Sequence, residues 1–334
     1  MVIVSRRSRV DKNRQFHIER IEILTRTEER DMQKNLYVKV LCSLTMLAML
    51  TACATTREAA WSEKQPETAQ EAQEGTAEDA LATLAAEADT AWAARSDHKQ
   101  VEIAVAKWTE LVAQQPTAET YVKISYAHYF LGNGHYALAG DQAGADKQFT
   151  DGLTAAEKGL AIAAPGMIEA LGNGVKHVDA LQKAPKEAVP SLYWHATNLS
   201  RWAASKGFAT KLRYKDDVKA TQERVKSLDD TFFYYAPYRY FGAFEAATAG
   251  LLGGDLNKST EYFKQAAEFA PHYLDTKILW AEYQCKKAVD RDLYVQLLNE
   301  VLAADPTVVP ELEPENRISQ AKAKTMLENV DEYF

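Results

Sequence analysis

Apolar residues recur at helical spacing through most of this chain. In residues 255–271 they fall at positions i, i+3, i+4 and i+7 from Phe263 to Ala270, and Pro271 ends the run. Steps of three and four residues place side chains on one face of a helix, whereas a half-buried strand requires alternation. Sustained alternation and Asn-Gly or Asp-Gly turns between β-branched runs are absent from this sequence. The pattern predicts an all-α fold over residues 80–334.

One spacing of three residues followed by proline occurs three times, with mostly small or apolar residues at the first three positions. It is typical of the second helix of a tetratricopeptide repeat, where a small residue admits the paired helix and a large one fills the gap between repeats. We therefore predict tetratricopeptide-like helical hairpins arranged as an α-solenoid. The three sets are Ala104, Trp108, Leu111 and Pro116; Ser259, Phe263, Ala266 and Pro271; and Tyr294, Leu298, Val301 and Pro306.

The tetrapeptide Leu-Gly-Asn-Gly occurs at 131–134 and again at 171–174, each time after a helical pattern. Because glycine accepts a left-handed backbone, we expect a helix to end at each copy. A segment near 180–235, which is richer in Lys, Asp and aromatic residues, is expected to interrupt the array.

A short apolar run near the N-terminus is typical of a targeting signal. Lys34 and Lys39 precede the apolar residues 40–50, and small residues then lead to Cys53. The run is shorter than the roughly 20 residues of a membrane-spanning helix, so we expect a signal peptide at 32–52. Its ending resembles the bacterial lipoprotein signal, in which the cysteine is lipidated. An ordinary secretory signal, or a buried helix with a chance cysteine, is the alternative.

This signal sets the expected organisation of the chain. Residues 1–31 fit no targeting pattern, so we interpret them as an extension from a start codon assigned too early. Residues 53–79 are rich in Glu, Ala, Gln and Thr, and we expect a lipid-anchored flexible tether there. The helical-repeat domain follows at 80–334. Ala54 after the cysteine favours the periplasmic face of the outer membrane under the usual sorting convention.

Charge and cysteine content exclude several classes of function. Of 39 basic and 47 acidic residues, 10 and 6 lie within 1–52, which leaves 29 and 41 and a net charge of −12. A chain this acidic, without clustered Lys or Arg, is not expected to bind nucleic acid. Cys285 has no cysteine partner once Cys53 is lipidated, and we expect it to be a small core residue.

Motifs for catalysis, metal binding or cofactor binding are absent from the sequence. It contains no His-Glu-x-x-His, Cys-x-x-Cys, calcium loop, Gly-x-Ser-x-Gly or phosphate loop. We therefore expect no enzyme activity, no metal and no cofactor. A catalytic role for one of the scattered residues His128, His135 and His195 is the remaining enzyme hypothesis.

Aromatic residues are densest in 232–244, and Tyr193, Trp194 and Trp202 join them if the two helices pair. They could form the wall of an apolar groove for a solute or partner, because aromatic side chains give much contact area at little entropy cost. They could equally pack the core.

Two arginines lie among these aromatic residues. Arg239 could contact an anion or carboxylate, or it could be a structural arginine paired with Glu245 or Asp255. Arg201, beside Trp202, has the same two interpretations.

The region from about Ala80 to the C-terminus resembles the T-component family of TRAP transporters, which are TatT-like periplasmic lipoproteins. The resemblance is strongest from Ser191 to Leu302. Its most specific parts are Leu192-Tyr193-Trp194, Arg201-Trp202, the run PYRYFG at 237–242 and the run GGDL at 253–256.

This resemblance implies a non-enzymatic helical-repeat lipoprotein that forms a homotrimer and docks a TRAP solute-binding protein. It also implies an apolar pore or groove in each protomer. Tyr238 stands where the family pattern leads us to expect His. A general repeat scaffold in cell-envelope assembly is the alternative function. The candidate ligand- or partner-binding residues are Tyr193, Trp194, Asn198, Arg201, Trp202, Tyr234, Tyr238, Arg239 and Phe241.

Overall fold

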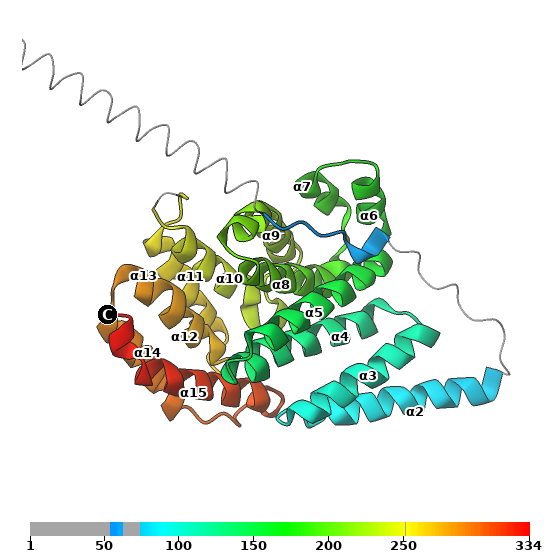
Figure 1. Ribbon diagram of the computed structural model, residues 1–334, viewed down its shortest axis with the longest axis horizontal. Coiled ribbons are helices and arrows are strands. Elements are labelled where there is room, and N and C mark those ends of the chain that lie inside the picture. Colours follow the sequence, from blue (N-terminus) through cyan, green and yellow to red (C-terminus); the bar gives the residue numbers. More distant parts are fainter. Residues whose placement is uncertain (1–53, 63–73, 251) are drawn as a thin grey trace, which may run out of the picture. The chain divides into compact units, whose positions relative to one another are not determined.

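The described part of the chain is helical, as the apolar spacing predicts (Figure 1). The computed structural model describes residues 54–62, 74–250 and 252–334. Within these ranges there is no β-strand, and a single isolated bridge joins Ala249 and Gly254. The all-α prediction is confirmed.

The chain divides into two units, Met1–Thr55 and Thr56–Phe334. The predicted start extension, the signal peptide and Cys53 all lie outside the described residues. The second unit has its own apolar core, as expected of a domain that folds independently. None of the described helices is both long and apolar enough to cross a membrane.

Most of the described body is α-helical. Its α-helices are α2 (Glu74–Ala93), α3 (His98–Gln114), α4 (Ala118–Phe130), α5 (Gln142–Ala163), α6 (Pro165–Gly172), α7 (His177–Ala180), α8 (Val189–Ser205), α9 (Phe208–Leu228), α10 (Phe232–Thr248), α11 (Leu256–Phe269), α12 (Asp275–Leu279), α13 (Lys286–Ala288), α14 (Arg291–Ala303) and α15 (Glu313–Glu328). Two π-helical segments, η2 (Leu131–Tyr136) and η5 (Trp280–Cys285), follow α4 and α12.

Helices that follow one another pack together in pairs. Contacts join α2 with α3, α4 with α5, α8 with α9, α10 with α11 and α14 with α15, and α5 also packs on α8. The C-terminal helix α15 returns to the first hairpin, where Arg95 Nε and Nη2 each lie 2.9 Å from a carboxylate oxygen of Glu315. This buried bidentate pair joins α15 to the connection between α2 and α3.

The three proline-terminated spacings lie on α3, α11 and α14, and their spaced residues are buried. On α11, Ser259 Oγ donates a hydrogen bond of 2.7 Å to the Gly242 carbonyl of α10. A Cβ on Gly242 would lie 2.8 Å from the Phe263 ring. Small residues therefore allow α10 and α11 to approach closely, as predicted. The prediction that the hairpins are repeats of one unit is not tested by this observation.

The two Leu-Gly-Asn-Gly copies differ in structure. At the second copy the helix ends as predicted, with Gly174 at φ +78°. At the first copy the helix continues as the π-helical η2, and the left-handed residue is Gly140. The prediction of a stop at 131–134 is wrong because Gly132 is buried against the Phe149 ring, where tertiary packing favours continued helix.

Two predicted boundaries also differ from the structure. The segment expected to interrupt the array forms α8 and α9, and α8 packs directly on α5, so this region continues the body. Helix α2 begins at Glu74, inside the stretch predicted as tether.

Candidate ligand site

A cavity of about 210 Å³ lies among α4, α8, α9, α10, α12 and η5. Its lining residues extend from Tyr129 to Tyr283 along the chain, so only the assembled fold creates it. Alanine, valine, leucine and phenylalanine side chains form much of the wall. Phe208 and Leu252 line the cavity while remaining 60% and 45% exposed. An apolar surface inside the body can thus be reached from solvent.

Arg239 is fixed within this wall by an unusual turn of the backbone. Phe233, Tyr234 and Tyr235 have φ of 47°, 56° and 57°, a left-handed conformation that costs about 1–2 kcal/mol per residue. The guanidinium of Arg239 donates to the Phe233 carbonyl at 2.8 Å and also to the Tyr234 carbonyl. It lies 4.1 Å from the centre of the Tyr273 ring. Arg239 therefore stabilises the turn that brings these aromatic residues into the body.

The acidic partners considered for Arg239 bind elsewhere. Glu245 Oε2 accepts a 2.9 Å hydrogen bond from the backbone nitrogen of Asp255, which begins α11. The structural interpretation of Arg239 is therefore supported, but with backbone carbonyls and a ring in place of a carboxylate.

Arg201, on α8, occupies a different environment in the same cavity. Its guanidinium lies near the side chains of Tyr129, Tyr283 and Glu282. Burial opposes its charge, yet these neighbours raise the pKa of Arg201 above its ordinary value. Across the described ranges, no carboxylate forms a salt bridge with Arg201. The cavity therefore contains a charged guanidinium without an acidic partner in direct contact.

Buried tyrosine hydroxyls surround these arginines. Burial raises the pKa of Tyr193 to about 12, and it also raises the pKa of Tyr129 and of Tyr273. These hydroxyls stay protonated at neutral pH and can donate hydrogen bonds into the cavity.

The structure divides the predicted site residues into two groups. Tyr193, Arg201 and Arg239 line the cavity. Trp194 instead stacks on Tyr126 with ring centres 4.4 Å apart, which is core packing.

The other predicted residues do not line the cavity themselves, and they pack on or hydrogen-bond to neighbouring residues. Asn198 Nδ2 donates to Ser125 Oγ at 3.0 Å and to the Trp194 carbonyl at 3.1 Å. Trp202 packs on Tyr214, and Phe241 packs on Tyr262. Tyr234 stacks on Tyr273, and the Tyr238 hydroxyl donates a hydrogen bond to Asp230.

Several cavity residues were missed by sequence reasoning. They lie outside the aromatic-rich stretch, on α4, α12 and η5 and in the connection that precedes α12: Tyr129, Tyr273, Asp275 and Tyr283. Isolated tyrosines at helical spacing look like ordinary core residues, so no local signal distinguishes them.

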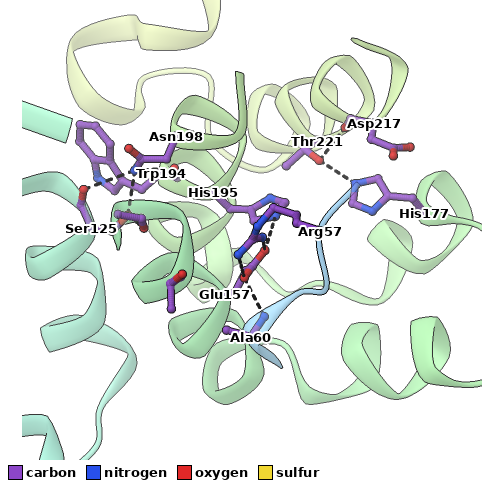
Figure 2. A network of polar contacts seen from close by, with 12 residues as sticks. Arg57, Ala60, Ser125, Glu157, His177, Trp194, His195, Asn198, Asp217 and Thr221 are labelled. Atoms are coloured by element: carbon purple, nitrogen blue, oxygen red, sulfur yellow. Dashed lines mark hydrogen bonds and ion pairs between the residues drawn. The ribbon is translucent and has the colours of Figure 1, made fainter. Parts of the chain in front are cut away.

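A second polar cluster attaches the N-terminal segment of the body to α5 and α8 (Figure 2). We call Arg57, Ala60, Glu157 and His195 the N-terminal clasp. The Arg57 guanidinium forms a bidentate pair with Glu157, and the Ala60 nitrogen donates to Glu157 Oε2 at 2.8 Å. His195 Nε2 lies 3.9 Å from Glu157 Oε1. Residues four to seven positions after Cys53 are thereby held against the helical body, within the stretch predicted as a tether.

The three histidines and Cys285 have structural environments. Burial lowers the pKa of His195 to about 3, so it is neutral at physiological pH. His128 Nδ1 lies 2.6 Å from Gln148 Oε1, and His135 Nε2 lies 3.3 Å from the Arg95 carbonyl. Cys285 is fully buried, which confirms its predicted place in the core.

Residues 114–334 match the family model described as TRAP transporter T-component. The match covers more than half of the chain and contains every residue that lines the cavity. No curated protein shows significant similarity to the chain. The chain therefore belongs to the TRAP transporter T-component family, a family of transporter components.

Proposed function

We propose that the protein is a lipid-anchored accessory subunit of a TRAP-type uptake system, where it docks the solute-binding protein and holds an apolar ligand. In this proposal Cys53 carries the lipid at the periplasmic face of the outer membrane, and the body forms a homotrimer. Family membership supports the transport role. The observation that carries the ligand role is the cavity of about 210 Å³ with its apolar wall.

The exposed apolar residues of the cavity support docking at the same place. Phe208 and Leu252 line the cavity and also face solvent, so a solute-binding protein seated over them would cover apolar surface and face the ligand. Transfer between the two proteins would then avoid exposing an apolar solute to water.

An affinity capture from periplasmic extract tests this proposal, with the chain from Ala54 onward as bait. We expect a TRAP-type solute-binding protein among the bound proteins, and weaker capture by Phe208→Ser. Val308→Ser is the matched control, because Val308 is 53% exposed and does not line the cavity. Recovery of envelope-assembly proteins alone would contradict the proposal and favour a general repeat scaffold.

A further inference from the structure

The N-terminal clasp shortens the link between Cys53 and the helical body. The Arg57 guanidinium is paired with Glu157, and the buried Ala60 donates its backbone N–H to the same carboxylate. Arg57 comes only four residues after Cys53, and four residues span at most about 14 Å when fully extended. A lipid on Cys53 would therefore hold the clasp close to the membrane surface.

Helices α6 and α7 belong to the part of the body that the clasp segment contacts. Figure 1 shows η1 (Ala60–Ser62), which follows directly from the clasp, beside α6. Trp61 of η1 packs against the apolar cluster that includes Met167 of α6 and Ala180 of α7. The surface of these two helices is therefore within reach of the membrane that would anchor Cys53.

Apolar side chains stay exposed on this part of the body. Val175 and Val178 are 39% and 51% exposed, and Ile162 at the end of α5 is 38% exposed. The turn after α6 is exposed at every residue from 172 to 176, so it projects toward solvent. None of these residues lines the cavity. The exposed apolar area here is thus separate from the candidate ligand site.

Exposed lysines accompany these apolar side chains. Long lysine side chains can lie along an apolar surface and extend their ammonium groups to the phosphates of lipid headgroups. Residues 162–187 contain three lysines and three acidic residues, so their formal charge is zero, whereas the chain beyond residue 52 carries −12. An anionic membrane repels such a neutral stretch less than it repels the rest of the chain. We call the following residues the α6–α7 surface: Ile162, Val175, Lys176, Val178, Lys183 and Lys186.

We infer that the α6–α7 surface rests on the phospholipid headgroups of the membrane that anchors Cys53, so that the body lies on the membrane in one orientation. This inference rests on the lipid anchor of the proposed function and adds the face that meets the membrane. Segments that lie in a membrane interface combine apolar side chains with Lys or Arg in this way. The short link from Cys53 to the clasp keeps this surface near the headgroups.

Acetylation of lysines with a low amount of reagent, followed by mass spectrometry, tests the inference. The chain from Cys53 onward is coupled through Cys53 to maleimide lipids in vesicles of phosphatidylethanolamine and phosphatidylglycerol. Cys285 is buried, so the coupling is restricted to Cys53. We expect the three lysines of the α6–α7 surface to react several-fold more slowly on vesicles than in the uncoupled protein. Three exposed lysines on α11, α13 and α15, which Figure 1 shows away from α6 and α7, should react equally in both: Lys264, Lys287 and Lys324.

Substitution of the exposed valines tests the apolar part of the contact. The double variant Val175→Ser and Val178→Ser should lose most of the protection of the three lysines on vesicles, because it removes apolar area from the interface. Val308→Ser is the matched control, since Val308 is 53% exposed in the connection between α14 and α15, and it should keep the protection. Thermal unfolding of each variant confirms first that it is folded, as expected for substitutions at exposed sites.

Three results would each overturn the inference. The first is equal acetylation of the α6–α7 surface with and without vesicles, and the second is unchanged protection in the double variant. The third is protection that appears in the uncoupled protein as its concentration rises, which would assign this face to a contact between copies of the chain. The mass of Cys53 in protein extracted from membranes tests lipidation separately, so failure of the proposed face is distinguishable from failure of the proposed anchor.

Discussion

Arg57→Gln should destabilise the protein more than Glu157→Gln does, although both substitutions remove the same ion pair. The side chain of Glu157 is 1% exposed, whereas that of Arg57 is 17% exposed and lies near the start of the described body. In Arg57→Gln the carboxylate stays buried after losing its guanidinium. In Glu157→Gln the arginine can turn into solvent, and a neutral amide remains in the interior.

The expected magnitudes follow from this asymmetry. Removing one partner of a buried pair costs about 3–5 kcal/mol when the remaining charge stays buried. We expect that range for Arg57→Gln. For Glu157→Gln we expect about 1–2 kcal/mol, because the glutamine oxygen can still accept from the Ala60 nitrogen.

Urea unfolding of both variants, followed by tryptophan fluorescence, measures these free energies. The double variant completes the cycle, and it should be more stable than Arg57→Gln alone because the buried charge is gone. Equal costs for the two single variants, or costs below about 1 kcal/mol as for a surface pair, would refute this role of the clasp.

Three further predictions concern packing and titration. Gly132→Ala should cost about 1–3 kcal/mol in unfolding experiments, because the new Cβ would lie 2.8 Å from the Phe149 ring, whereas Gly166→Ala has open space and should not destabilise. Burial raises the pKa of Cys285 to about 12, so iodoacetamide at neutral pH should label it only after unfolding; labelling of the native protein would contradict its burial. Burial lowers the pKa of His195 to about 3 from an ordinary 6.5. Between these pH values the unfolded protein binds a proton at His195 and the folded protein does not, so stability should fall as the pH drops from 6.5 to 3. His195→Asn should reduce that pH dependence in urea titrations.

The helical class and the paired packing of α3, α11 and α14 could be predicted because they depend on local spacing. The Leu-Gly-Asn-Gly copies show where local reasoning ends. Both contain the same residues, but the first lies against Phe149 and against Ile318 from distant α15, and these contacts keep it helical. A contact of that sequence separation cannot be read from a tetrapeptide.

The candidate site was predictable only in part for the same reason. The aromatic-rich stretch led to Tyr193, Arg201 and Arg239, which do line the cavity. Tyr129 on α4, and Tyr273 in the connection between α11 and α12, come from segments without such a signal. The left-handed turn at 233–235 was also missed, because it contains no glycine and is stabilised by Arg239.

The most direct test of the proposed role is a binding measurement between this protein and the TRAP solute-binding protein of its own organism. Biolayer interferometry with the body from Ala54 onward immobilised should give saturable binding that Phe208→Ser weakens and Val308→Ser does not. Absence of binding, with both proteins shown to be folded, would contradict the proposed role as the docking subunit of a TRAP system.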